Sequence, residues 1–362
     1  MAVGVGIGRF VYTPILPPMA AALGLSKATS GLIASANFAG YLVGALGATR
    51  ATLPGSRRAW LLGALLASAA TTGGMGFCGT VPGFLLLRFL GGVASALALI
   101  LASTLVLDRL AEAGRPGLAA LHFAGVGVGI AVSAALVGLL PAAGGDWEAM
   151  WWLSGAVSVL GMLAVTALVP AVSGQTTALV LPGASASNPP LRRMTVAYGL
   201  FGFGYVITAT FLVAIVRATP AIRALEPVIW IVVGLAAAPS VWFWTVLGRR
   251  IGLSAAFGIA ALAEAGGVLA SVAWPSSTGI CAAAVLVGGT FMGLTALGLM
   301  RGRELATGDP RRVLAAMTGA FGIGQIVGPA LAGVVAQFTG GFEVPSLAAA
   351  GALVAAAWLA RR

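Results

Sequence analysis

The sequence predicts an all-α membrane protein that crosses the bilayer twelve times, in two halves of six helices. Three observations carry this prediction. Hydrophobic residues make up 59% of the 362 residues and charged residues only 8%, which is too little polar surface to cover a water-soluble globule of this size. The apolar segments are long enough for helices that span a bilayer, which need roughly 20 residues. They also lack the alternating polarity of a membrane β-barrel.

Twelve apolar segments are bounded by charges, prolines or glycine clusters. The predicted spans cover residues 2–22, 29–49, 59–77, 83–107, 117–140 and 149–169, and then 194–216, 227–247, 252–274, 278–300, 313–337 and 344–360. The first segment is interpreted as a span and not as a secretory signal, because it lacks a basic start and Arg9 interrupts its apolar stretch. It begins almost at Met1, so its start is open to trimming or misassignment.

Residues 170–193 form the longest polar connection and are rich in serine, threonine and proline. Such a composition is typical of a linker. We therefore expect an N-terminal half over residues 1–169, a cytoplasmic linker over 170–193 and a C-terminal half over 194–362.

The basic residues predict the orientation, since lysine and arginine are retained in cytoplasmic loops. With a cytoplasmic N-terminus, fifteen of the twenty basic residues fall on the inner side, and Lys27, Arg217 and Arg223 fall on the outer side. Arg9 and Arg88 lie inside spans. We expect a multi-pass protein of the bacterial inner membrane, monomeric, with both termini in the cytoplasm.

The two halves repeat. Residues 127–138 match residues 322–333 at six of twelve positions, at an offset of 195. Residues 6–8 correspond to 202–204 at an offset of 196, and 91–92 to 288–289 at 197. Two parallel six-helix repeats are what the major facilitator architecture requires, with the substrate site at mid-membrane between them.

Several function classes are disfavoured. The net charge of +11 is spread over the loops and does not form the clustered face of a nucleic-acid-binding protein. Glycine pairs such as Gly40 with Gly44, and Gly125 with Gly129, lie in apolar spans, where they favour close helix packing over nucleotide binding. No nucleophile–base set, metal-ligand set or cofactor motif is visible, so we expect no enzyme activity, metal or cofactor. Cys78 and Cys281 are expected to be free thiols.

Arg9 is the strongest indication of a site. An arginine near the middle of a span costs roughly 2.5–3.5 kcal/mol on insertion scales and so should face a cavity or a partner. Tyr12 and Thr13 follow three and four residues later on the same helix face, which predicts one polar stripe. The alternative for Arg9 is a structural hydrogen bond to carbonyls of a neighbouring helix.

Other polar residues inside spans are further candidates. Arg88 either lines the cavity or reaches the outer interface, and Val285 takes its place in the second half. Glu264 and His122 are candidates for proton coupling, because buried carboxyl and imidazole groups can exchange protons near neutral pH; structural pairing is the alternative for both. The remaining predicted cavity residues are Asn37, Tyr41 and Gln325.

Three segments resemble the YbfB/YjiJ branch of the major facilitator superfamily: residues 6–17 (GIGRFVYTPILP), 35–41 (SANFAGY) and 202–211 (GFGYVITATF). Residues 88–92 (RFLGG) resemble the arginine motif of the superfamily's fourth span. The loop after the second span lacks the usual aspartate, and the fifth span lacks the usual proline. The resemblance covers the whole chain and implies transport of small molecules.

We therefore expect a secondary transporter for a small organic molecule, anionic or zwitterionic, with possible coupling to protons. The predicted substrate cavity consists of Arg9, Tyr12, Thr13, Asn37, Tyr41, Arg88 and Gln325. Two alternatives remain at this point: a multidrug efflux transporter, and a transporter-like sensor that binds its ligand without moving it.

Overall fold

The structure, a computed structural model, describes residues 1–50, 55–140, 144–169, 188–307 and 310–361. Within these ranges the chain is helical nearly throughout and contains no strand. Among the described residues, eleven helical segments are long and apolar enough to cross a membrane. The first predicted span is divided into shorter pieces and supplies the remaining crossing. The predicted all-α architecture is therefore confirmed.

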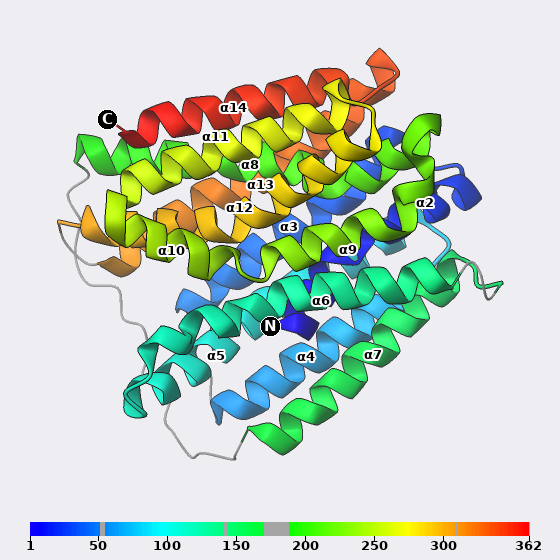
Figure 1. The fold of residues 1–362 in the computed structure, drawn as a ribbon. Helices are drawn as coiled ribbons and strands as arrows, with labels where there is room; N and C mark the ends of the chain where they lie inside the picture. The colour runs from blue at the N-terminus through cyan, green and yellow to red at the C-terminus, as the bar shows by residue number, and fades with distance from the viewer. Residues whose placement is uncertain (51–54, 141–143, 170–187, 308–309, 362) are drawn as a thin grey trace.

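The first half contains η1 (Ala2–Ile7), α1 (Gly8–Phe10), α2 (Tyr12–Leu23), α3 (Lys27–Arg50), α4 (Arg57–Gly74), η2 (Met75–Phe77), α5 (Val81–Glu112), η3 (Pro116–Leu118), α6 (Ala119–Leu139) and α7 (Trp147–Leu168). The second half contains α8 (Pro189–Ala218), η5 (Pro220–Leu225), α9 (Glu226–Ala237), α10 (Ser240–Ile251), α11 (Leu253–Ala273), α12 (Ser277–Glu304), α13 (Pro310–Thr339) and α14 (Glu343–Arg361). In Figure 1, α8 and α10–α14 lie above α4–α7.

Short polar side chains begin several of the helices by accepting a hydrogen bond from the backbone N–H three residues later, the usual N-cap arrangement. Ser56, Asp146, Asn188 and Ser276 do so for α4, α7, α8 and α12. The cap at Asn188, followed by two prolines, starts α8 at Pro189, inside the predicted linker. Helix α8 thus begins within the predicted linker, and residues 170–187 lie outside the described part of the chain.

The first span is not one continuous helix over residues 2–22. A π-helical turn, η1, is followed by the short α1, and Val11 separates α1 from α2. The change of hydrogen-bonding register from i→i+5 to i→i+4 interrupts the helix. Pro14 has no N–H to donate to the carbonyl of Phe10, so regular α-helical hydrogen bonding cannot continue across Val11. Apolar composition predicts a crossing, but it does not report this change of register.

The eighth span is also divided. The predicted helix over 227–247 ends at Ala237 and resumes at Ser240, because Pro239 lacks the N–H that a continuous helix would need. The Ser240 hydroxyl donates to the carbonyl of Gly289 on α12 at 2.9 Å and accepts from the Gly293 N–H at 3.0 Å. The Trp244 indole N–H donates to the same Gly289 carbonyl at 2.8 Å. These bonds fix the break against α12.

Glycines bring helices into close contact, as predicted. A methyl group on Gly40 of α3 would overlap the carbonyl oxygen of Phe89 on α5, and one on Gly44 would lie 2.9 Å from the carbonyl oxygen of Val93. One on Gly129 of α6 would overlap the backbone of Ala2 in η1. Such small-residue contacts let backbones approach closely in the absence of a hydrophobic driving force between membrane helices.

Replacing Gly40 by alanine is therefore expected to destabilise the protein by about 1–3 kcal/mol, because the added methyl group overpacks the α3–α5 contact. Gly47 on the same helix is the matched control, since a methyl group there would meet no atom within 4 Å. Thermal unfolding in detergent measures both variants. Equal melting temperatures for Gly40→Ala and Gly47→Ala would contradict this packing.

The internal repeat is visible in equivalent contacts. Gly129 in the fifth span packs against Ala2 in the first span. Gly324, its equivalent in the eleventh span, packs against Gly199 in the seventh span. The same pair of helices thus meets in each half, which is what a duplicated six-helix unit requires.

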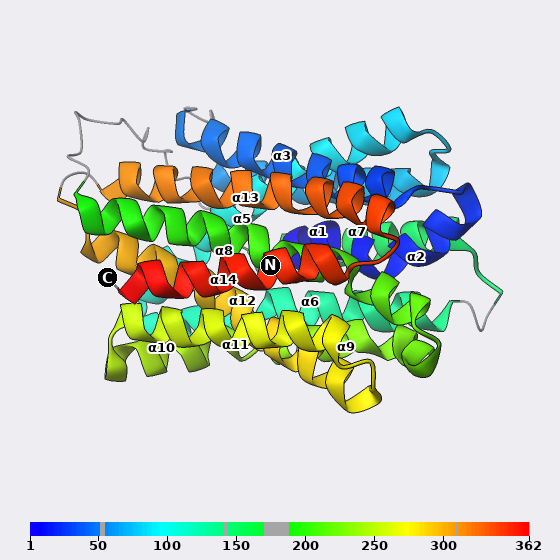
Figure 2. The same ribbon diagram turned by 90° about the horizontal axis from the view of Figure 1, so that it is seen from above.

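The pairs of helices that join the halves in the described part of the chain include α2 with α8, α3 with α13 and α6 with α9. The Thr13 hydroxyl on α2 donates to the carbonyl of Ala209 on α8 at 2.7 Å, and the Ser35 hydroxyl on α3 donates to that of Ile326 on α13 at 2.7 Å. Gly234 on α9 lies against the backbone of α6 near Gly127. Figure 2 shows α3 beside α13 along this boundary. Backbone acceptors and small residues, and no described ion pair, hold the halves together.

Lys27 at the start of α3 adds a contact across the same boundary. Its ammonium donates to the carbonyl of Ala336 at 3.3 Å and to that of Gly340, and lies 5.6 Å from the Phe342 ring centroid. It therefore satisfies carbonyls at the end of α13, where a helix leaves acceptors unpaired.

Replacing Lys27 by methionine is expected to weaken this end of α13 by about 1 kcal/mol, the value of a partly exposed charged hydrogen bond. Hydrogen exchange of the backbone around residues 336–344 should become several-fold faster, whereas Lys27→Arg should retain most of the protection. Unchanged exchange in Lys27→Met would refute the contact.

Candidate functional site

Arg9 lies at the break in the first span, surrounded by aromatic rings. Its guanidinium carbon is 4.3 Å from the centroid of the Tyr41 ring and 4.8 Å from that of Phe38, both on α3. The neighbouring Phe10 ring is 5.5 Å away. We call these four residues the Arg9 cluster. Ring faces carry partial negative charge and stabilise a cation that has lost its water.

Only 7% of Arg9 is exposed, and its Nε and Nη2 atoms are buried without a hydrogen-bond partner. The alternative of a structural hydrogen bond to neighbouring carbonyls is therefore not realised by these two atoms. Buried charged donors without acceptors are costly. The aromatic rings compensate part of this cost, but Nε and Nη2 still lack an acceptor.

Arg88 on α5 makes the carbonyl contacts that Arg9 lacks. Its Nη1 donates to the carbonyl of Gly8 at 3.2 Å and its Nη2 to that of Arg9 at 3.0 Å, so it holds the backbone at the break. Its guanidinium carbon lies 5.0 Å from the centroid of the Tyr12 ring. Since Arg88 is 4% exposed, it does not reach the membrane interface.

Tyr12 and Thr13 have partners of their own. The Tyr12 hydroxyl donates to the carbonyl of Ser30 at 2.8 Å, and its ring lies beneath Arg88. The Thr13 hydroxyl is used in the bond to Ala209 between the halves. Because the helix breaks between Arg9 and Tyr12, the spacing of three and four residues does not produce the single polar stripe that the sequence predicts.

Asn37 supports Arg88 from α3. Its Nδ2 donates to the backbone carbonyl of Arg88 at 2.9 Å, and its Oδ1 is buried without a partner. Tyr41, four residues later on the same helix, belongs to the Arg9 cluster. The predicted pair thus contacts both arginines, one through the backbone and one through a ring face.

Gln325 on α13 faces the site from the second half. Its amide nitrogen donates to the hydroxyl of Tyr205 on α8, and its Oε1 is buried without a partner. The Tyr205 ring is stacked between Phe291 and Phe321, with interplanar angles of 6° and centroid distances of 5.7 and 5.8 Å. We call these three rings the aromatic stack.

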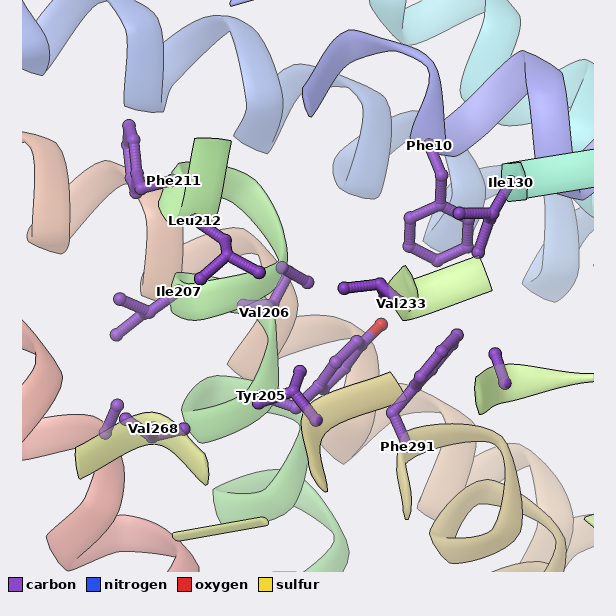
Figure 3. Close-up of a cluster of buried hydrophobic side chains, with 14 of the residues drawn as sticks. Phe10, Ile130, Tyr205, Val206, Ile207, Phe211, Leu212, Val233, Val268 and Phe291 are labelled. Atoms are coloured by element: carbon purple, nitrogen blue, oxygen red, sulfur yellow. The ribbon is translucent and has the colours of Figure 1, made fainter. Parts of the chain in front are cut away.

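The aromatic stack and the Arg9 cluster meet through Phe10. The Phe10 ring contacts the edge of Phe291 at a centroid distance of 5.7 Å. Figure 3 shows Tyr205 and Phe291 parallel to each other, with the Tyr205 hydroxyl pointing towards Phe10 and Val233. The two halves thus present a cation and an aromatic wall to each other.

Tyr205 was not among the site residues predicted from the sequence, although the internal repeat relates it to one of them. At the offset of 196 that relates the first and seventh spans, Tyr205 is the equivalent of Arg9, and Ala209 is the equivalent of Thr13. The bond between Thr13 and Ala209 therefore joins equivalent positions and lies beside the axis that relates the halves.

Glu264 on α11 is fully buried, and neither carboxyl oxygen has a hydrogen-bond partner. Thr290 on α12 is close to the carboxyl group, but its hydroxyl donates to the carbonyl of Leu286 at 2.6 Å. Helix α11 packs against α12, the helix that carries Phe291 of the aromatic stack. Glu264 takes part in none of the described ion pairs.

His122 on α6 is half-buried and makes its contacts elsewhere. Its Nε2 is 3.3 Å from the Ser103 hydroxyl on α5, and its ring packs edge-on against Phe123 at 5.2 Å. Within the described residues, no group of three or more histidine, cysteine, aspartate or glutamate side chains is arranged to hold a metal ion.

A hollow of about 330 Å³ between α4 and α7 lies apart from these residues. Its lining is apolar and includes Leu66, Gly73, Phe77, Trp152 and Val159. Leu66, Phe77 and Trp152 are exposed, as expected for a surface that faces lipid. It contains none of the predicted site residues.

Comparisons with known proteins agree with this fold. A family model described as "Uncharacterised MFS-type transporter YbfB" matches residues 1–361. A search of curated proteins finds no match.

Among solved structures, the chain is similar to a mutant of the nucleoside transporter NupG, with a TM-score of 0.74 and 16% identity over 99% of this chain and 98% of that chain. It is also similar to a bacterial homolog of the human lysosomal transporter Spinster in an inward-facing and occupied conformation, with a TM-score of 0.73 and 16% identity over 99% and 93% of the two chains. At this identity the likeness shows the fold alone.

Proposed function

Because the chain belongs to the YbfB-like family of MFS-type transporters, we propose that it is a secondary transporter that moves a small organic anion or zwitterion across the inner membrane by alternating access. The observation that carries this proposal is the buried, unpaired guanidinium edge of Arg9 between the two halves. A cation held at mid-membrane without an acceptor is expected to bind a ligand of opposite charge.

The contacts between the halves support an inward-open conformation. Lys27 makes its hydrogen bonds to the second half near the ends of the helices that the basic residues assign to the outer side. Gly138 at the end of α6 and Pro227 at the start of α9 are in contact at that same side. The resemblance to an inward-facing Spinster homolog agrees with this proposal. The orientation with both termini in the cytoplasm, and a monomer in the bilayer, belong to the same proposal.

Proton coupling through Glu264 is the second part of the proposal. The carboxyl group is fully buried on α11, which packs against α12, the helix that carries Phe291 of the aromatic stack. A change in its protonation would therefore alter the electrostatics of the site. His122, the other titratable candidate, contacts Ser103 and Phe123 instead.

Reconstitution into liposomes tests the function. Uptake of candidate anions and zwitterions should exceed that of protein-free liposomes, an imposed pH gradient should drive it, and Arg9→Ala should abolish it. Transport of every substrate that is insensitive to Arg9→Ala would refute the site, and a pH gradient that drives no flux would refute the coupling.

The same assay separates the two alternatives. A multidrug efflux transporter would move lipophilic cations, which the charges of Arg9 and Arg88 disfavour. A sensor would bind a ligand and show no flux. A neutral nucleoside, the class of compound carried by the structurally similar nucleoside transporter NupG, would leave the guanidinium edge of Arg9 unpaired.

A further inference from the structure

We infer that the site at Arg9 selects a monocarboxylate carried on an aromatic body. This inference rests on the proposed transport function and names its substrate class. It follows from the geometry of one guanidinium edge, the absence of a compensating acid among the described residues, and the rings around the group.

The unpaired atoms of Arg9 form a single edge. Nε and Nη2 lie side by side in the plane of a guanidinium, with parallel N–H bonds, and this edge matches the two oxygens of a carboxylate. Both atoms are buried, and both lack a partner. A bidentate acceptor would satisfy the two donors together and relieve the cost of burying them. Since neither atom is exposed, the ligand must displace the packing around this edge.

The second arginine offers no comparable edge. Both Nη atoms of Arg88 donate to the carbonyls of Gly8 and Arg9, which leaves its Nε alone without a partner. Arg88 therefore adds positive potential near the site but has no free pair of donors. One free edge indicates one carboxylate and not a dicarboxylate.

No described acid neutralises Arg9. The ion pairs of the described residues include Arg57–Asp108, Arg109–Glu112, Arg217–Glu226 and Arg301–Glu304. Each of these pairs is partly exposed. The fully buried Glu264 is absent from them. The uncompensated charge favours an anion over a neutral or cationic ligand.

The aromatic rings around Arg9 indicate which group the carboxylate is attached to. Tyr41, Phe38 and Phe10 lie within 5.5 Å of the guanidinium, and Phe10 continues to Phe291 of the aromatic stack. The buried side-chain oxygens without a partner near the site are Asn37 Oδ1, Gln325 Oε1 and Ser68 Oγ, which lies against Gly8. A sugar would need many more polar partners, whereas an aromatic ring gains from edge and face contacts with the existing rings.

Binding to the purified full-length protein tests the inference through its melting temperature, since a ligand of the folded state raises it. The probes are benzoate, phenylacetate and hippurate, with three comparison compounds. Benzamide keeps the shape without the charge, benzenesulfonate keeps the charge with tetrahedral geometry, and acetate lacks the ring. We expect the aromatic carboxylates to stabilise the protein at concentrations about 10- to 100-fold below the comparison compounds, as the loss of a charged hydrogen-bond pair predicts.

Variants of Arg9 test whether its guanidinium edge causes the stabilisation by aromatic carboxylates. Arg9→Gln should abolish stabilisation by benzoate, and Arg9→Lys, which keeps the charge without the edge, should abolish the preference for benzoate over benzenesulfonate. Arg115→Gln is the matched control, because Arg115 is exposed in the connection after α5. The inference is overturned if none of the aromatic carboxylates stabilises the wild-type protein, if benzamide matches benzoate, or if folded Arg9→Gln still responds to benzoate.

Flux of radiolabelled hippurate into liposomes, corrected for protein-free liposomes, separates this inference from the proposed function. Arg9-dependent binding without flux would support the carboxylate site and refute transport. Arg9-independent flux of a neutral compound, with no binding of carboxylates, would support transport and refute the carboxylate site.

Discussion

Replacing Arg88 by glutamine is expected to abolish transport and to lower the stability of the protein by about 3 kcal/mol, the value of two hydrogen bonds to a charged group. The variant loses the bonds to the carbonyls of Gly8 and Arg9 and leaves both carbonyls without these partners in a buried region. The backbone of α1 would then no longer hold the Arg9 side chain among its rings. Thermal unfolding in detergent and flux in liposomes measure the two effects.

The second half provides an internal comparison for this prediction. Val285 occupies the position equivalent to Arg88, and the seventh span, α8, runs unbroken from Pro189 to Ala218. An arginine is thus present where the helix is broken and absent where it is continuous. Arg88→Lys should retain part of the stability, because one ammonium can reach one carbonyl. Arg115→Gln should change neither quantity, and a stable, active Arg88→Gln would contradict the role of Arg88 in holding the break.

The fold was predictable because the lengths of the apolar segments and the positions of the charges between them can be read directly from the sequence. Most predicted spans correspond to one described helix each, since a bilayer requires uninterrupted internal hydrogen bonding. The first and eighth spans differ because their breaks depend on hydrogen-bond register. Pro239 marks the second break in the sequence, but the π-helical turn before Val11 has no comparable sequence signal.

The site residues that could be predicted from the sequence are the charged ones, because burying a charge inside a span is costly. Arg9 and Arg88 were identified because arginines inside a span require compensation. Their different contacts were not predictable, because these depend on which arginine reaches the broken backbone. The rings of Phe38 and Phe291 were missed for another reason: aromatic residues are common in apolar spans, and only their arrangement around a cation distinguishes them.

Glu264→Gln is expected to leave the melting temperature nearly unchanged, within about 1 kcal/mol in free energy, and to remove the dependence of transport on a pH gradient. Glutamine has the same shape as glutamate, and the buried carboxyl oxygens have no hydrogen bond that the substitution would break. An ionised carboxylate would be costly in this environment, so a neutral amide is well tolerated. Flux of hippurate with and without an imposed gradient measures the coupling.

Two further variants separate coupling from packing at this position. Glu264→Ala should lower the melting temperature, because removal of this fully buried side chain leaves a cavity between α11 and α12. Glu112→Gln, at the exposed end of α5, should retain gradient-driven flux. If Glu264→Gln still accumulates hippurate in response to a pH gradient, another group carries the proton. A proton on Glu264 would remove a buried negative charge from the second half, and an anion on Arg9 would neutralise a buried positive charge in the first half. Binding of the proton would therefore favour binding of the anion, which gives coupling an electrostatic cause.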